Sequence, residues 1–171
     1  MKNIELKVKV GDRTAMTRLI RKLGAEREGI LRQTDTYFDV PDGRLKLRET
    51  KGEAVSQLIF YSRPNKKASR LSEYDILRMP EDEAEKLKRL LTHALSVKVI
   101  VKKERTLFIF GNTRIHLDRV TGLGDYLELE TVMGKQPLTE AKREHTHVIK
   151  ELWLDSCEKI PVSYSDLLMD M

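Results

Sequence analysis

Alternating polar and apolar positions mark most of the strands that the sequence predicts. From Ile4 to Val10 every second residue is apolar, and the residues between them, Glu5, Lys7 and Lys9, are charged. Because successive side chains of a strand point to opposite faces, this segment has one apolar and one charged face. Similar signals predict strands at 34–40, 44–50, 54–63, 73–77, 97–104, 105–110, 113–120 and 126–132.

Three segments have the apolar stripe of a helix that packs on a core. The first follows Asp12, a good helix cap, and ends at Gly24, which favours the backbone conformation that stops a helix. The second begins at Pro80, and three acidic residues in its first turn suit the helix dipole. The third spans 139–154 and precedes an irregular tail at 161–171. All three stripes need an apolar surface to cover.

The charged faces of the predicted strands carry both signs. They contain Glu5, Lys7, Lys9, Arg44, Lys46, Arg48, Tyr61, Arg63, Lys103, Arg105, Arg114, His116, Asp118, Glu128 and Glu130. In a sheet with one wet face these side chains would only meet water. If the antiparallel strands close into a barrel, the charged faces line a water-filled tunnel and the apolar faces pack on the helices. We therefore predict an α+β fold, a closed antiparallel β-barrel with flanking helices.

Composition narrows the class of protein. The 171 residues, 40% of them hydrophobic and 35% charged, suit one globular domain. The sequence lacks an uncharged apolar run of about 18 residues that could cross a membrane, and it turns acidic at Glu5 before any signal-peptide core. Cys157 is the only cysteine, which excludes an intramolecular disulfide and a multi-cysteine zinc site. We expect a cytoplasmic protein that does not bind membranes.

The charge balance points to an anionic ligand. The chain carries 32 Lys and Arg against 27 Asp and Glu, a net charge of +5. In a tunnel, Arg and Lys would hold phosphate oxygens, while Glu oxygens would hold Mg²⁺ or Mn²⁺. This combination suits a polyphosphate with a divalent cation. No nucleic acid is expected as a partner, because the basic residues share enclosed faces with carboxylates and no aromatic array accompanies them.

Six blocks of the sequence and its ending point to a known family. The blocks are 5–9 (ELKVK), 33–38 (QTDTYF), 44–48 (RLKLR), 101–105 (VKKER), 115–120 (IHLDRV) and 122–130 (GLGDYLELE), and the ending is 163–168 (SYSDLL). They resemble the CYTH superfamily, or triphosphate tunnel metalloenzymes, and the ending resembles its cyclase-like members. The superfamily includes class IV adenylyl cyclases, thiamine triphosphatases, inorganic triphosphatases and RNA triphosphatases. The resemblance implies a single CYTH-like domain over 1–171 with an eight-stranded tunnel.

The resemblance also implies roles for individual residues. The positions matching phosphate contacts are Lys9, Lys46, Arg48, Arg63, Lys103 and Arg105. The candidate catalytic residues among them are Lys9, Lys103 and Arg105. The positions matching metal ligands are Glu5, Asp118, Glu128 and Glu130, and Glu73 matches a further acidic position. His116 is either a proton-transfer group or a polar side chain that fills the lumen.

One position departs from the family pattern. The first strand of the family reads Glu-x-Glu-x-Lys, and Lys7 takes the place of the second glutamate. The exchange removes an oxygen ligand and changes the local charge by about two units, only about 7 Å from Glu5 on the same face. We therefore expect weaker metal binding than in relatives that keep both glutamates.

Two functions fit the predicted tunnel. The first is an enzyme that binds a nucleoside triphosphate, thiamine triphosphate or tripolyphosphate and cleaves it with Mg²⁺ or Mn²⁺. Attack by water makes it a phosphohydrolase, and attack by the ribose 3′-hydroxyl makes it an adenylyl cyclase. The second is a catalytically impaired protein that binds a triphosphate or polyphosphate without turnover, because of Lys7. The expected partner is a triphosphate-containing small molecule, and the expected state is a monomer or homodimer.

Overall fold

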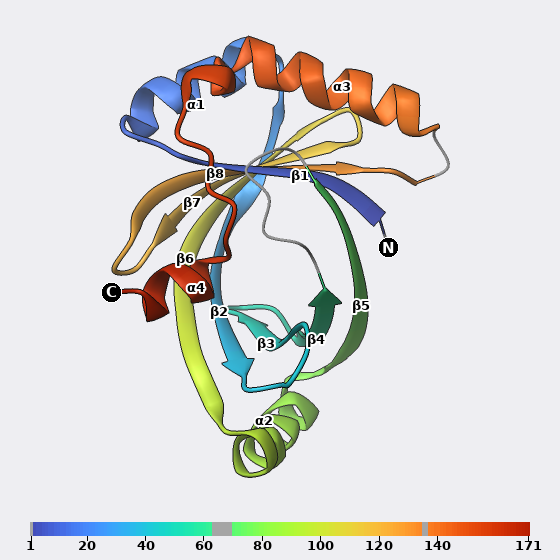
Figure 1. Cartoon of the computed structure of the whole chain (residues 1–171), viewed down its shortest axis with the longest axis vertical. Helices are drawn as coiled ribbons and strands as arrows, with labels where there is room; N and C mark the ends of the chain where they lie inside the picture. The colour runs from blue at the N-terminus through green and yellow to red at the C-terminus, as the bar shows by residue number, and fades with distance from the viewer. Residues whose placement is uncertain (1, 63–69, 135–136) are drawn as a thin grey trace.

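Eight antiparallel strands build one strongly curled sheet in the part of the chain that the computed structural model describes, residues 2–62, 70–134 and 137–171 (Figure 1). The strands are β1 (Lys2–Lys9), β2 (Glu26–Phe38), β3 (Arg44–Thr50), β4 (Val55–Ser62), β5 (Arg70–Pro80), β6 (Val97–Phe110), β7 (Thr113–Val120) and β8 (Gly124–Val132). Their order is β1-β5-β4-β3-β2-β6-β7-β8, and β1 pairs with both β5 and β8. The predicted α+β architecture is confirmed.

Helices lie at both ends of the curled sheet. They are α1 (Arg13–Lys22), α2 (Glu81–Leu95), α3 (Leu138–Glu151) and α4 (Tyr164–Met169), with a short 3-10 helix, η1 (Leu154–Ser156), after α3. In Figure 1, α1 and α3 cover one end and α2 lies at the other. The predicted cap of α1 is present, because the Asp12 carboxylate accepts hydrogen bonds from the backbone N–H groups of Thr14 and Ala15, both at 2.9 Å.

The apolar faces of the strands pack on the helices, as the alternation predicts. One cluster joins α1 and α3 to β1, β7 and β8 and includes Leu6, Ile20, Leu127 and Val148, all almost fully buried. A second cluster brings α2 against the other end of the sheet. Burial of each such Leu, Ile or Val side chain stabilises the fold by roughly 1.5–3 kcal/mol. Because the apolar faces turn outward to the helices, the charged faces turn into the lumen.

Several predicted elements differ from the structure, among them the strand predicted at 73–77, which spans Arg70–Pro80. β2 begins at Glu26 rather than 34, because its first half pairs with β6 through a register shift between Arg27 and Gly29. The segments 97–104 and 105–110 form one continuous strand, since no turn residue separates Glu104 from Arg105 and both pair within the same ladders. The tail predicted as irregular contains α4, which begins after Ser163 with a capping box.

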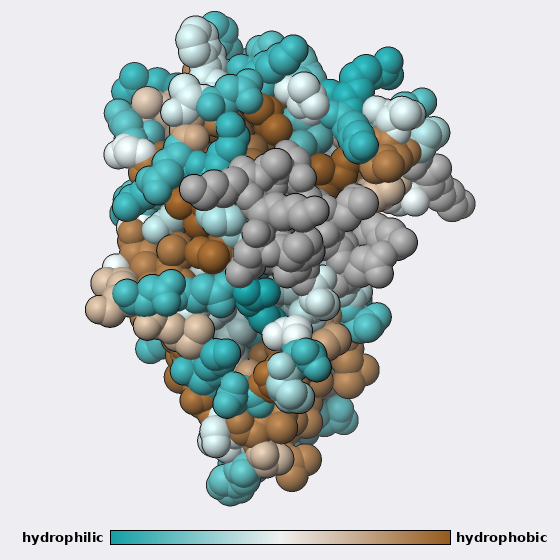
Figure 2. All heavy atoms as spheres, in the orientation of Figure 1, coloured by the Kyte–Doolittle hydropathy of each residue, from teal (hydrophilic) through white to brown (hydrophobic). Residues whose placement is uncertain are grey.

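The surface differs between the two ends. Figure 2 shows hydrophilic side chains over α1 and α3 and more hydrophobic ones toward the end that carries α2. Within the described ranges, no helix combines the length and the apolar character needed to cross a membrane.

Candidate functional site

A cavity of about 430 Å³ lies inside the curled sheet. All eight strands contribute side chains to its wall, and Ser163 and Tyr164 join them from the C-terminal segment. The volume falls within the range of about 300–1,000 Å³ that is usual for small-molecule sites. The inward charged faces therefore enclose a space large enough for a ligand.

One wall of the cavity is basic. It is formed by Lys46 and Arg48 on β3 and by Lys103 and Arg105 on β6, and these strands flank β2. Alternation along each strand explains why both members of each pair point inward. Lys46, Lys103 and Arg105 are buried and Arg48 is half-buried. The structure thus brings together four of the six predicted phosphate-binding residues.

Asp35 on β2 is the centre of this basic wall. Its carboxylate accepts hydrogen bonds from Arg48 Nε at 2.7 Å, Arg48 Nη2 at 2.8 Å, Lys46 Nζ at 3.0 Å and Lys103 Nζ at 2.8 Å. Burial opposes ionisation of this carboxyl, but Arg48, Lys103 and Lys46 hold its pKa well below the usual range. Asp35 therefore stays ionised and fixes the positions of the three cations.

Asp35 is not among the predicted site residues, although Asp35 lies in the block 33–38 that carries the family resemblance. Its position could have been found from the parity of its strand. Asp35 shares a face with Gln33 and Tyr37, and that face lines the cavity between β3 and β6. A buried carboxylate between two basic strands is an expected partner for their cations.

Lys46 has a pKa that lies close to neutral pH. Burial lowers its pKa to about 7, and repulsion from Arg48 and Lys103 adds to this effect, while Asp35 opposes it. The Lys46 ammonium also lies 5.3 Å from the centre of the Tyr37 ring and 5.6 Å from that of Tyr61. A phosphate in the cavity would favour the charged form of Lys46.

The opposite wall is acidic. Glu5 on β1 lies directly opposite Glu130 on β8 in the strand register, and both line the cavity with Glu128. Glu130 accepts a hydrogen bond from the Tyr74 hydroxyl at 2.7 Å. Burial would raise the pKa of Glu130, but His116, the Tyr74 hydrogen bond and nearby cations lower it instead. Glu130 is therefore ionised at neutral pH.

Arg105 connects the basic and acidic walls. Its guanidinium binds Asp118 through Nε at 2.7 Å and Nη2 at 2.6 Å, and Nη2 also lies 2.7 Å from Glu128. Asp118 is fully buried and also accepts a hydrogen bond from the Tyr164 hydroxyl at 3.0 Å. Asp118, predicted as a metal ligand, is therefore engaged by Arg105 and Tyr164 and is not among the residues that line the cavity.

Lys7 lies inside the acidic wall with its ammonium buried. Its Nζ is 3.2 Å from Glu128 Oε1, donates to the carbonyl of Val162 at 3.0 Å and lies 4.0 Å from the centre of the Tyr164 ring. Burial raises the pKa of the Glu128 carboxyl, but Lys7, His116 and Arg105 together lower it by more. The pKa of Glu128 therefore lies well below its usual range. Lys7 thus places a positive charge beside Glu128, a predicted metal ligand.

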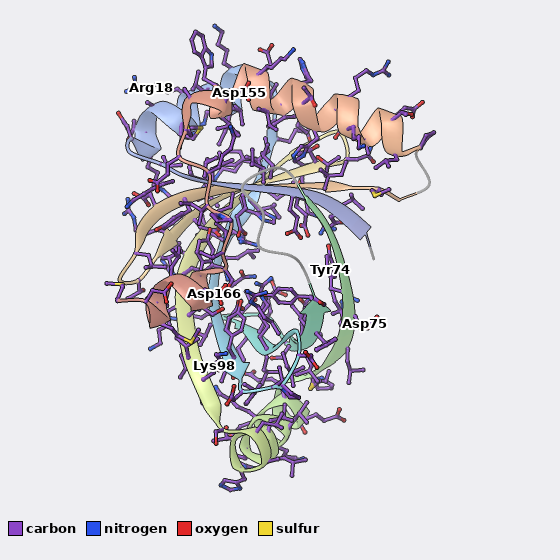
Figure 3. The ribbon with its side chains drawn as sticks, viewed as in Figure 1. Arg18, Tyr74, Asp75, Lys98, Asp155 and Asp166 are labelled. Atoms are coloured by element: carbon purple, nitrogen blue, oxygen red, sulfur yellow. The ribbon has the colours of Figure 1, made fainter. Side chains whose placement is uncertain are left out.

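The C-terminal segment completes the site. Its contribution was not predicted from the sequence. Tyr164 packs edge-on against Tyr126 with ring centres 5.2 Å apart, and Arg44 on β3 binds Asp166 on α4 at 2.7 Å. Figure 3 shows Asp166 on α4 and Tyr74 on β5 on opposite sides of the curled sheet in this view. The local sequence around Val162 and Tyr164 does not indicate that they contact residues inside the sheet. Their partners, Lys7 and Asp118, lie far away in the sequence.

The remaining predicted site residues lie elsewhere. Lys9 is exposed at the end of β1 and is not among the residues that line the cavity. It pairs with Tyr126 of β8, and its backbone N–H donates to the Glu158 carbonyl. Arg63 lies outside the described residues, and so does the side chain of Glu73. His116 lines the cavity near Glu128 and Glu130, and burial with repulsion from Arg105 lowers its pKa.

Most of the sequence matches a known family model. The CYTH domain model matches residues 1–164. The chain belongs to the CYTH family. No curated protein sequence is significantly similar to it.

Several solved structures share the fold. The PH1012 protein of Pyrococcus horikoshii is 28% identical, with a TM-score of 0.79 over 96% of this chain and 98% of that one. A candidate adenylate cyclase from Vibrio parahaemolyticus is 19% identical, with a TM-score of 0.77 over 98% and 97%. A candidate adenylyl cyclase from Hippeastrum with a dominant triphosphatase activity is 17% identical, with a TM-score of 0.68 over 98% and 95%.

Proposed function

We propose that this CYTH protein binds a triphosphate compound in the lumen of its curled sheet, which forms a closed tunnel, and cleaves it with a divalent cation. The observation that carries the proposal is the convergence of Lys46, Arg48, Lys103 and Arg105 on one cavity of about 430 Å³. A chain of three phosphates carries more charge and reaches farther than a monophosphate, so it can meet all four cations together. The substrate is a nucleoside triphosphate, thiamine triphosphate or tripolyphosphate.

The basic wall would bind and orient the phosphates. Arg48 and Arg105 present planar forks that suit phosphate oxygens, and Lys46 and Lys103 add point charges between them. Asp35 holds three of these groups in place before a ligand arrives, so less side-chain freedom is lost on binding. The low dielectric of the buried wall strengthens each charge-assisted contact.

The acidic wall would hold Mg²⁺ or Mn²⁺. Mg²⁺ is usually bound by one or two carboxylates together with substrate phosphates. Glu5 and Glu130 meet this need, because they face each other across adjacent strands and both line the cavity. Within the described ranges no group of three or more His, Cys, Asp or Glu is placed to hold a metal ion. When bound, the ion would neutralise phosphate charge.

The attacking group decides the reaction. Water yields a phosphohydrolase, and the ribose 3′-hydroxyl of a nucleotide yields a class IV adenylyl cyclase. His116 is the cavity group that could accept a proton, since its lowered pKa keeps the imidazole neutral near pH 7. Its ring nitrogens lie 4.0 Å from Glu128 and 3.9 Å from Glu130.

A second candidate function is binding of a triphosphate or polyphosphate without turnover. The ion pair of Lys7 with Glu128 favours it, because the ammonium neutralises a carboxylate that would otherwise attract metal. In this case Lys7 adds a further cation near the phosphates. The basic wall would act in the same way in both functions.

A substrate panel separates these functions. The protein is incubated with ATP, thiamine triphosphate or tripolyphosphate, each with Mg²⁺, with Mn²⁺ or with a chelator, and phosphate, pyrophosphate and cyclic AMP are measured. Phosphate release indicates hydrolysis, and pyrophosphate with cyclic AMP indicates cyclisation. Tight binding without any product supports the binding protein. If no triphosphate binds more tightly than phosphate at equal ionic strength, the proposal is wrong.

A further inference from the structure

The end of the molecule that α1 and α3 cover carries six exposed cations. The two helices share one apolar cluster, so their exposed faces turn outward from the same end of the sheet (Figure 1). Figure 2 shows hydrophilic side chains over this end. The cations are Arg18, Arg21 and Lys22 on α1 and Lys142, Arg143 and Lys150 on α3. Together with Trp153, which follows α3, they form a surface that we call the α1–α3 face.

The cations of the α1–α3 face lack acidic partners. None of the six forms an ion pair with another described residue, whereas the exposed Lys86 of α2 pairs with Asp82 at 3.5 Å. Helix α1 contains no acidic residue. Glu144 of α3 is turned toward the sheet, where it accepts hydrogen bonds from Asn112 and Thr113. Like charges without partners repel one another, so an anionic ligand would stabilise this face.

Trp153 adds an exposed aromatic ring to the same face. Its side chain is 72% exposed, and its backbone has the left-handed conformation, with φ at 58° and ψ at 31°. After the end of a helix this conformation is usually adopted by glycine or asparagine, and it is strained for a bulky residue. The fold thus holds a large ring in water at the cost of backbone strain. A partner that buries the indole would offset this cost.

An open hollow runs along α3 beside these groups. Its lining residues recur at intervals of three and four, so they form one stripe of the helix. They are Thr139, Lys142, Arg143, Thr146, His147 and Lys150. The stripe offers ammonium, guanidinium and hydroxyl donors on successive turns. Such a row of donors suits carboxylates that are spaced along a peptide segment.

We propose that the α1–α3 face binds an acidic segment of another protein. The carboxylates of this segment would meet the cations, and its apolar side chains would cover Trp153. Tryptophan and arginine are the residues that contribute most at protein interfaces, and opposite charge guides the encounter of two proteins. This inference does not depend on the ligand of the lumen, because none of the residues of the face lines the cavity.

The pattern of charges favours a protein over a nucleic acid or an anionic membrane. Glu140 and Glu151 are exposed on α3, and Asp155 is exposed on η1. Figure 3 shows Asp155 and Arg18 at this same end. A uniform array of phosphates would be repelled by these three carboxylates. A folded or extended protein segment can place a neutral or basic group opposite each of them.

The fluorescence of Trp153 tests the proposal, because it is the only tryptophan of the chain. The probe is a tryptophan-free peptide of repeating Glu-Glu-Leu, and the matched control is a peptide of repeating Gln-Gln-Leu of the same length. We expect the acidic peptide to bind saturably and to shift the indole emission to the blue, because the ring leaves water. The neutral peptide should produce no shift at the same concentrations.

Matched charge reversals locate the bound peptide. Arg18→Glu and Lys142→Glu should each weaken the affinity for the acidic peptide about tenfold. Lys51→Glu makes the same change of net charge at an exposed position outside the face, and it should change the affinity less than about twofold. An unchanged melting temperature shows that each variant is folded.

Trp153→Asn separates binding from folding. Asparagine adopts the left-handed conformation readily, so this variant should keep or raise the melting temperature. Its affinity, measured by the fluorescence anisotropy of a labelled acidic peptide, should fall about tenfold. A residue with a purely structural role would show the opposite pattern, a lower melting temperature with unchanged peptide affinity.

Three results would overturn the proposal. The first is an acidic peptide that binds no more tightly than the neutral one. The second is an equal loss of affinity in Lys51→Glu and Arg18→Glu, which would indicate a response to net charge alone. The third is a blue shift of Trp153 at lower concentrations of phosphatidylserine vesicles or single-stranded RNA than of the acidic peptide. That result would assign the face to a membrane or a nucleic acid instead of a protein.

Discussion

Arg48 donates two hydrogen bonds, at 2.7 and 2.8 Å, to the carboxylate of Asp35 on the neighbouring strand of the curled sheet. The two residues lie directly opposite each other in the register of β2 and β3, and Asp35 is only 1% exposed. Lys46 and Lys103 bind the same carboxylate. An internal anion thus gathers cations that would otherwise repel one another, and it does so where a phosphate chain is proposed to bind.

The first prediction concerns this internal anion. Asp35→Asn should lower the free energy of unfolding by about 3 kcal/mol or more, because it leaves two buried lysines and the half-buried Arg48 without their counter-charge. Denaturant unfolding at neutral pH measures the change. The matched control is Asp75→Asn on β5, an exposed position where a change within about 0.5 kcal/mol is expected. Equal effects at the two positions would contradict the role given to Asp35.

The second prediction concerns the pH dependence of ligand binding. The folded-state pKa of Lys46, about 7, lies below its usual value, so Lys46 is charged below that pH and loses its charge as the pH rises. Triphosphate binds the charged form, and affinity should therefore fall as the pH rises through neutrality. Lys46→Arg keeps its charge throughout and should bind tripolyphosphate with a flatter profile. Ionisation of the ligand affects both proteins equally, so parallel profiles would exclude Lys46 as the titrating group.

The third prediction concerns the lysine in the acidic wall. Lys7→Glu should raise the affinity for Mn²⁺ and any metal-dependent turnover, because it replaces the cation paired with Glu128 by an oxygen ligand. Calorimetric titration with Mn²⁺ measures the effect. Lys7→Met is the control, since it removes the ammonium without adding a ligand. If Lys7→Glu and Lys7→Met bind Mn²⁺ equally, residue 7 is not part of a metal site.

The fourth prediction separates the two charged walls. Arg48→Ala should weaken tripolyphosphate binding with or without Mg²⁺, because it removes a charge-assisted contact to phosphate. Glu130→Gln should abolish metal-dependent turnover but leave metal-free binding intact or tighter, since it removes a negative charge that repels phosphate. Affinity measured with Mg²⁺ and with a chelator distinguishes the two patterns. A solvent-facing sheet would show small and similar effects for both variants.

Short-range pattern in the sequence was enough to predict most elements and the inward charged faces. Period-two alternation decided which side chains of β1, β3, β6, β7 and β8 share a face, and the apolar helix stripes decided which face turns outward. The predicted extents of some strands were wrong where the local pattern carried no signal. β2 begins earlier and β6 continues without a break because pairing partners distant in sequence, rather than the residues themselves, extend those strands.

The individual partners inside the lumen were decided only by the tertiary structure. Whether Asp35, Asp118 and Lys7 face a ligand or one another depends on contacts such as Lys7 with Val162 and Asp118 with Tyr164, between residues far apart in the chain. The curl of the sheet also sets which strands lie side by side, and so places β4 and β5 between β3 of the basic wall and β1 of the acidic wall. Alternation assigns a side chain to a face, but only the folded chain brings the opposing charge within hydrogen-bond distance.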